Sequence, residues 1–196
     1  MTTTDTPLLL TLTDLPRAIG STVHRSLAWT APDDLGTSSM RVEPGTELAP
    51  EVDLTSVDDG VLVRLTMAVD LIGECVRCLD PVRAHHDVEA AEVYFEPGDP
   101  RHRRARQQAE DEPEEDDVAR IGPHDTIDVE PLVRDSVVTL VDPLPLCRPD
   151  CPGLCPVCGE RLADLPAGHR HEDVDPRLAG LAALLEDAPG SEGDAR

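Results

Sequence analysis

Residues 58–71 read DDGVLVRLTMAVDL and carry the strongest strand signal in the chain. From Val61 to Leu71 every second residue is apolar, and several of the residues between them are polar. A period of two over this length predicts a strand with one buried face. Because the Asp-Gly step at 59–60 is typical of hairpins, we expect a partner strand just before it, around residues 52–54.

A second alternating pattern follows a short cysteine motif. Residues 82–90 are apolar or histidine at every second position, and the apolar phase then shifts by one residue over 91–95. This shift predicts a β-bulge, or the end of the strand with an accidental pattern beyond it. With an apolar run at 8–12, these patterns predict an antiparallel β-rich domain over residues 1–96, as a sheet or a partly closed barrel.

The next segment, residues 97–124, has no hydrophobic periodicity. It holds a cluster of arginines at 101–106 and an acidic run at 110–117. Because such a composition cannot bury enough apolar surface, it predicts a disordered charged linker or loop. The segment is either a solvated spacer or a contact arm, in which the arginines touch RNA and the acidic run touches a basic protein.

From Asp128 the period changes to that of a helix, with apolar residues on one face as far as Val141. Asp128 can cap this helix and Pro131 suits its first turn, although the β-branched run at 137–139 also suits a strand. A last helix is expected from Asp175-Pro176 to about residue 188. Residues 125–196 are therefore expected to form a helix, a cysteine-rich segment and a C-terminal helix packed on the first domain. The predicted fold class is α+β.

Six cysteines in a chain without a recognisable signal peptide indicate metal ligands or redox groups rather than disulfides. Residues 147–159 read CRPDCPGLCPVCG, and the turn-forming proline and glycine around the C-x-x-C pair are typical of a zinc knuckle. We predict one structural zinc ion held by Cys155, Cys158 and two further ligands from an upstream cysteine pair or a downstream histidine pair. The candidate ligands are Cys147, Cys151, Cys155, Cys158, His169 and His171.

A second C-x-x-C pair, Cys75 and Cys78, lies at the predicted turn between two strands. It could be a structural thiol pair, packed or linked to a metal, or a redox pair. A thioredoxin-like redox motif opens a helix, whereas the flanking strands predict a hairpin, so we favour the structural interpretation. His85, Asp87 and Glu89 are expected to lie on a solvated strand face.

The formal net charge of −23 limits the partners of the chain. Phosphate backbones are bound by neutralising them with Lys and Arg, so free binding to RNA or DNA is disfavoured and a basic protein is attracted. No segment approaches the length of an apolar membrane span, and we expect no membrane association, no small-molecule substrate and a cytoplasmic location.

Three ordered motifs resemble the YceD family of large ribosomal RNA subunit accumulation proteins: GECVRCLDP at 73–81, IDVEPLVRD at 127–135, and the cysteine-rich run at 145–159. The resemblance implies a role in ribosome biogenesis and no catalytic activity. Some members of that family keep the pair that matches Cys75 and Cys78 but lack the C-terminal cluster, which suggests that the two motifs are independent. Others carry C-x-C where this chain has His169-Arg170-His171, which favours a histidine as a zinc ligand.

Three functions are compatible with these observations. The first is a non-enzymatic assembly factor that supports accumulation or processing of large-subunit rRNA by contacting a basic ribosomal protein or an assembly intermediate, with rRNA bound indirectly or weakly. The second is a zinc-dependent nucleic-acid-binding module, although residues 143–166 offer only two arginines and no aromatic residue. The third is a thiol-disulfide oxidoreductase that uses Cys75 and Cys78.

Overall fold

A computed structural model of the chain describes residues 7–96 and 119–171, and the chain divides into two compact units, Met1–Cys151 and Pro152–Arg196. The division differs from the expected grouping of residues 125–196, because residues 125–151 belong to the first unit. The helix expected from residue 175 lies outside the described residues. No helix in the described part of the chain is long and apolar enough to cross a membrane.

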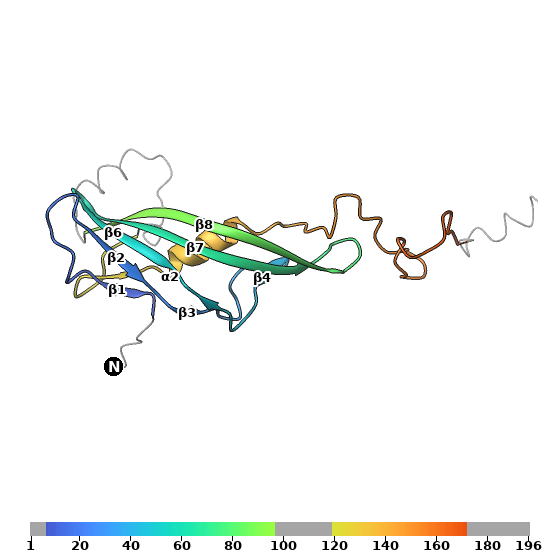
Figure 1. Cartoon of the computed structure of the whole chain (residues 1–196), viewed down its shortest axis with the longest axis horizontal. Coiled ribbons are helices and arrows are strands. Elements are labelled where there is room, and N and C mark those ends of the chain that lie inside the picture. The colour runs from blue at the N-terminus through green and yellow to red at the C-terminus, as the bar shows by residue number, and fades with distance from the viewer. Residues whose placement is uncertain (1–6, 97–118, 172–196) are drawn as a thin grey trace, which may run out of the picture. The chain divides into compact units, whose positions relative to one another are not determined.

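The main sheet of the first unit is antiparallel and is built around β7 (Gly60–Glu74) (Figure 1). One edge of β7 pairs with β6 (Glu51–Val57) and β4 (Met40–Val42), and the other pairs with β8 (Pro81–Phe95). β2 (Thr22–Ser26) extends the sheet beyond β6. The predicted hairpin is confirmed, since Val57 pairs with Gly60 across the turn at 58–59.

The bulge expected in β8 is wrong. The pairing of β7 with β8 runs without interruption from Gly60↔Phe95 to Glu74↔Pro81. The apolar residues at 91, 93 and 95 therefore occupy outward positions of a regular strand, while Glu92 faces inward and is half-buried. Burial raises the pKa of Glu92, and the nearby Asp135 raises it further. A polar residue at an inward position thus produced the apparent phase shift.

Short elements complete the first unit. β1 (Leu9–Thr11) pairs with β9 (Thr126–Asp128), and β3 (Trp29–Thr30) pairs with β5 (Glu47–Leu48). The helix α2 (Glu130–Thr139) lies against the sheet beneath β7 and β8 (Figure 1) and buries Leu132, Val133 and Val137. The N-cap of α2 is Val129 rather than the expected Asp128, although the backbone N–H of Glu130 donates to Asp128 Oδ1. Among the described residues α2 is the one helix, and their strands do not close into a barrel.

The core of the first unit consists largely of Leu and Val side chains from the sheet, β1, β9 and α2. Tyr94 is buried with them, and its hydroxyl donates to the carbonyl oxygen of Asp128. Of the expected linker, residues 97–118 lie outside the described residues. The remaining residues, 119–124, belong to the fold: Ile121 is buried, and its N–H donates to the carbonyl oxygen of Phe95.

Candidate metal centres

The loop that joins β7 to β8 folds into a knuckle around Cys75 and Cys78. The N–H of Cys75 donates to the carbonyl oxygen of Asp80 at 2.7 Å, and the N–H of Leu79 donates back to the carbonyl oxygen of Cys75 at 2.9 Å. Leu79 has a φ of 63°, in the left-handed region that favours glycine. We call residues 74–81 the first knuckle.

The same backbone structure recurs around Cys155 and Cys158. The N–H of Cys155 donates to the carbonyl oxygen of Glu160 at 2.8 Å, and the N–H of Gly159 donates to that of Cys155 at 2.9 Å. Gly159 takes the left-handed position with a φ of 73°. Leu154 forms a bridge with Arg161, just as Glu74 pairs with Pro81 in the first knuckle. Residues 154–161, the second knuckle, are thus a local copy of the first.

The first knuckle meets the segment that follows α2. The Sγ atom of Cys75 lies 3.8 Å from that of Cys151, and Sγ of Cys78 lies 3.5 Å from that of Cys147. All four ligand atoms lie within 4.8 Å of one another. Four sulfur atoms at about 2.3 Å from a tetrahedral zinc ion would lie about 3.8 Å apart, so the group fits such an ion.

Backbone contacts hold the two sides of this first group together. The N–H of Val76 donates to the carbonyl oxygen of Pro145, and the guanidinium of Arg77 donates to that of Cys151 at 2.9 Å. Cys75, Cys78 and Cys151 are buried, and Cys147 is exposed. The first group is therefore set in place by hydrogen bonds that do not depend on a metal.

The second knuckle meets two histidines that follow it in the chain. Cys155, Cys158, His169 and His171 place their ligand atoms within 4.8 Å of one another. Cys158 Sγ lies 3.6 Å from His169 Nε2, and the two imidazole rings stand edge to face with centroids 4.6 Å apart. The N–H of His169 donates to the carbonyl oxygen of Pro166, which closes the turn that brings the histidines back.

Each knuckle favours the thiolate form of its first cysteine. Burial alone would raise the pKa of Cys75, but hydrogen bonds from the backbone N–H groups of Cys147, Arg77 and Cys78 lower it to about 6. Hydrogen bonds from the N–H groups of Cys158 and Val157 lower the pKa of Cys155 to about 6 as well. Metals bind the thiolate, so both knuckles are prepared for a cation.

The predicted ligands thus fall into two groups rather than one. Among the described residues, Cys147 and Cys151 lie with Cys75 and Cys78, whereas Cys155 and Cys158 lie with both histidines. The geometry does not support a single site made of the four cysteines at 147–158, and it joins Cys75 and Cys78 to Cys147 and Cys151 of the C-terminal cluster that we took as independent of them. A count of ligands could have indicated this, because six cysteines and two histidines make two tetrahedral sets.

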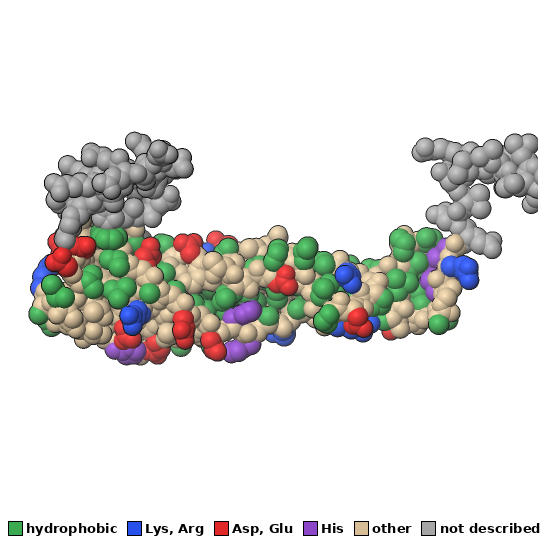
Figure 2. Space-filling view, turned by 90° about the horizontal axis from the view of Figure 1, so that it is seen from above, with side chains coloured by type: hydrophobic (Ala, Val, Ile, Leu, Met, Phe, Trp, Pro, Cys, Tyr) green, Lys and Arg blue, Asp and Glu red, His purple; other side chains and the backbone are tan. Residues whose placement is uncertain are grey.

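The polar residues on β8 lie where they were expected, on the outward face of the sheet. The Nδ1 atom of His85 lies 2.8 Å from Asp70 Oδ1, and both side chains are exposed. The pKa of His85 is raised, first by the hydrogen bond with Asp70 and then by its charge. Acidic and histidine side chains gather along one margin of the face in Figure 2. This surface is a solvated face rather than an enclosed site.

Comparisons with known proteins cover most of the chain. Residues 63–185 match the family model described as large ribosomal RNA subunit accumulation protein YceD. Uncharacterized proteins of Mycobacterium bovis and Mycobacterium tuberculosis are 38% identical to it over 180 residues, covering 91% of this chain and 82% of theirs. An uncharacterized protein of Mycobacterium leprae is 32% identical over 181 residues, covering 91% of this chain and 78% of its own. No solved structure matches the chain.

Proposed function

Since this chain belongs to the YceD family, we propose that it is a non-enzymatic assembly factor that supports accumulation or processing of large-subunit rRNA. It acts in the cytoplasm by contacting a basic ribosomal protein or an assembly intermediate. The observation that carries the proposal is the family match over residues 63–185, which spans both knuckles and the segments that complete them.

The metal in both groups is zinc, and its role is structural. Thiolate and imidazole are ligands that zinc prefers, and each group offers four of them. A catalytic zinc site keeps one position open for water or substrate, whereas four protein ligands close the coordination shell. In the first unit the ion clasps the tip of the β7–β8 hairpin to the segment at 145–151. In the second unit it holds the turn at 166–168 against the second knuckle.

The charge of the chain favours a protein partner over bare RNA. With a net charge of −23, the chain repels phosphate backbones and attracts basic proteins at long range. A gel shift with large-subunit rRNA fragments at physiological salt separates this proposal from a zinc-dependent nucleic-acid-binding module. We expect no shift without a partner protein, and a shift at low micromolar protein would favour the module.

The lowered pKa of Cys75 is weak support for the oxidoreductase alternative. The same shift occurs at Cys155, and in both cases backbone N–H groups of the knuckle cause it. Moreover, Cys75 opens a hairpin loop rather than a helix, so the setting of a thioredoxin-like motif is missing. The thiolate serves metal binding in this account.

Depletion of the protein in its own host tests the proposal. We expect the ratio of large- to small-subunit rRNA to fall, and expression of the wild-type chain to restore it. A variant with Cys75→Ser and Cys78→Ser should restore it poorly, because the clasp of the first unit is lost. The control is Asp33→Ser, which also introduces a serine but at an exposed position that belongs to neither cysteine group, and it should restore the ratio fully. An unchanged ratio after depletion contradicts the proposed function.

A further inference from the structure

Among the described residues, the outer edge of β8 has no backbone partner over most of its length. Within the described residues β8 pairs with β7 alone until Phe95, whose N–H donates to Ala119 and whose carbonyl oxygen accepts from Ile121. The backbone N–H and C=O groups of successive residues point to opposite edges of a strand. Since those of Phe95 point to the outer edge and the register is uninterrupted, the other odd-numbered residues of β8 also present theirs to this edge. Residues such as Asp87, Glu89 and Ala91 therefore offer backbone groups that no described residue pairs with.

A groove follows this edge where β8 runs beside α2. It has a volume of about 450 Å³ and lies between residues 87–90 of β8 and residues of α2 and its C-terminal cap, Asp135, Ser136, Thr139 and Leu140. An added strand runs about 4.8 Å from the strand it pairs with, so a strand on the β8 edge would enter this groove. The groove is open to solvent along the edge, and β8 and α2 belong to the same unit.

The charge around the edge selects the kind of strand that could bind there. Asp87 and Glu89 are exposed on the outward face, and Asp135 is exposed on α2. His85 carries a counter-charge when protonated, but it is engaged by Asp70 at 2.8 Å and lies 3.9 Å from Asp87. Arg134, the cation of α2, is held by Glu130 and Asp34. Although Arg64 and Arg83 are also exposed on the outward face, the edge at residues 87–89 is lined by acidic side chains, so it repels acidic strands and nucleic acid and admits a basic strand.

We propose that the outer edge of β8 binds an extended, basic segment of a partner protein as an additional strand in the groove beside α2. Backbone hydrogen bonds to the odd-numbered residues supply affinity, and side chains alternate between the two faces. Those on the outward face lie beside Asp87 and Glu89 and are Lys or Arg. Those on the α2 face lie beside Val88 and Leu140 and are small or apolar. This inference rests on the proposed function and names the chemistry of the partner.

The partial use of this edge by the chain itself supports the geometry. Arg120 already forms a parallel bridge with Phe95 through the hydrogen bonds of Ala119 and Ile121, so the edge accepts a backbone partner at its C-terminal end. An incoming segment would extend the same pairing toward Asp87. Among the described residues, no other segment pairs with the edge there.

Binding of short capped peptides to the zinc-loaded full chain, followed by fluorescence anisotropy, tests the proposal. The probe alternates Lys and Val, and its comparison peptides alternate Lys with Pro, which lacks the backbone N–H, and Glu with Val. We expect binding of the Lys–Val peptide and at least a tenfold weaker affinity, roughly, for each of the others, because one loses hydrogen bonds and the other is repelled.

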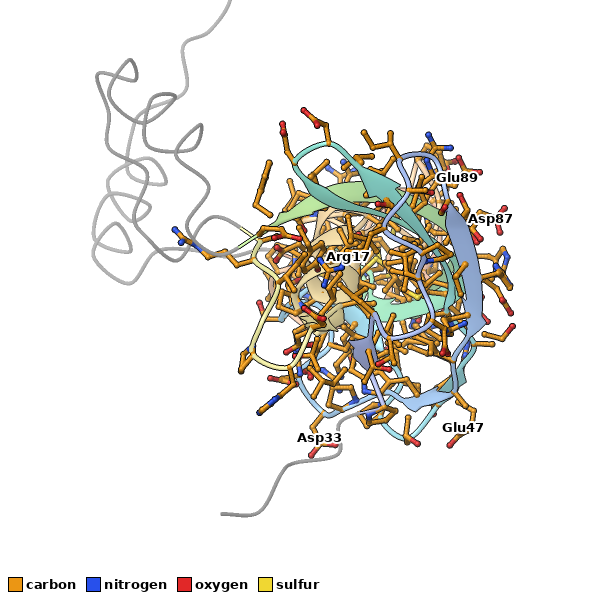
Figure 3. All side chains as sticks on the ribbon, turned by 90° about the vertical axis from the view of Figure 1, so that its left-hand side faces the viewer. Arg17, Asp33, Glu47, Asp87 and Glu89 are labelled. Atoms are coloured by element: carbon orange, nitrogen blue, oxygen red, sulfur yellow. The ribbon has the colours of Figure 1, made fainter. Side chains whose placement is uncertain are left out.

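Two substitutions at one position separate backbone pairing from charge. Glu89→Pro removes a free N–H and blocks the edge without removing a hydrogen bond to β7, whereas Glu89→Gln removes the charge alone. Glu89→Pro should abolish binding, and Glu89→Gln should weaken it by roughly threefold. A double reversal, Asp87→Lys with Glu89→Lys, should exchange the preference for the Lys–Val and Glu–Val peptides. Asp33→Lys is the matched control, since Asp33 projects from another part of the surface (Figure 3) and should leave binding unchanged.

Equal binding of the Lys–Val and Lys–Pro peptides, or full binding by Glu89→Pro, would overturn the proposal, because contact would then be electrostatic only. Absence of any binding would overturn it too. If Glu89→Pro lowers the unfolding temperature, the peptide preference of the Asp87→Lys, Glu89→Lys double variant tests the proposal instead. Failure of the peptide assay together with a fall in large-subunit rRNA after depletion would remove this inference and leave the proposed function standing.

Discussion

The two knuckles share one backbone structure but stand in different surroundings. The first lies between two long strands, and its remaining ligands come from 69 and 76 residues further along the chain. The second is completed by histidines that begin 11 residues after Cys158. The same local motif therefore links segments that are far apart in the sequence in the first unit, and segments that are close in the sequence in the second.

The two units also differ in their hydrophobic cores. All residues of the core cluster belong to the first unit. In the described part of the second unit, residues 152–171, Cys155 is the one buried side chain. A unit without an apolar core depends on its metal for folding, whereas a unit with a core depends on the metal for only part of its stability.

The largest expected effect is the loss of structure in the second unit when its metal is removed. With Cys155→Ser and Cys158→Ser, backbone amides of the second knuckle should exchange with solvent at the rate of an unfolded chain, because structural zinc supplies on the order of 10 kcal/mol in small zinc domains. Amides of β7 and β8 should keep their protection. Hydrogen exchange read by mass spectrometry measures both at once, and protection of residues 154–161 in this variant would show that the second unit folds without its metal.

A smaller effect is expected when the first clasp is opened. Cys147→Ser removes one ligand of the first group, and the first unit should lose up to about 4 kcal/mol, the value for a cross-link across some 70 residues, while its sheet still folds. Thermal unfolding followed by the β-sheet circular dichroism signal measures the change. Cys158→Ser is the control and should leave this transition in place. Equal shifts from both substitutions would mean that the two sites do not act separately.

The two knuckles should also share an early-titrating thiol in the metal-free protein. The pKa values of Cys75 and Cys155 are lowered from 9.0 to about 6, so two thiolates should form as the pH rises through about 6. Because the pKa of Cys155 is lower than in the unfolded chain, its shift favours the folded state above pH 9, and the advantage is lost as the pH falls through about 6. In the first group the raised pKa values of Cys78 and Cys147 oppose the corresponding contribution of Cys75. Ultraviolet absorbance of the thiolate reports the titration. Cys75→Ser and Cys155→Ser should each remove one early group, and ordinary titration in the parent chain would show that the knuckles do not prepare the thiolates.

The smallest effect concerns the left-handed residue of each knuckle. Leu79→Gly should stabilise the metal-loaded first unit or leave it unchanged, because relief of left-handed strain of about 1 kcal/mol offsets the flexibility of glycine. Gly159→Leu should weaken the second knuckle by a similar amount. Zinc affinity measured by competition with a chelator compares the two. If Leu79→Gly weakened zinc binding and Gly159→Leu strengthened it, the two knuckles would differ in backbone conformation.

Much of the fold was readable from local patterns. The alternation at 61–71 predicted β7, the Asp-Gly step predicted its hairpin with β6, and the period change at Asp128 predicted α2. The pattern of β8 suggested a bulge or a strand end because Glu92 occupies an inward position that a polar residue rarely takes. The open edge of β8 has no sequence signal, since it depends on which strands lie beside it.

The candidate sites were also predicted only in part, because one of them has a local signature and the other depends on the fold. The C-x-x-C pair at 155–158 has a local signature, and the structure places both proposed histidines beside it. The partnership of Cys75 and Cys78 with Cys147 and Cys151 is set by the fold, because α2 must pack on the sheet before the segment after it can reach the hairpin tip. Spacing along the chain therefore favoured the wrong neighbours for Cys147 and Cys151.

The zinc content of the purified chain and of two double variants shows whether the chain holds one metal ion or two. Elemental analysis against protein concentration should find two zinc ions per chain in the parent, one for each group of four ligands. It should find one with Cys75→Ser and Cys78→Ser, and one with Cys155→Ser and Cys158→Ser. A single ion in the parent that both Cys147→Ser and Cys155→Ser remove would contradict the account, because it would place Cys147 and Cys155 in one shared site.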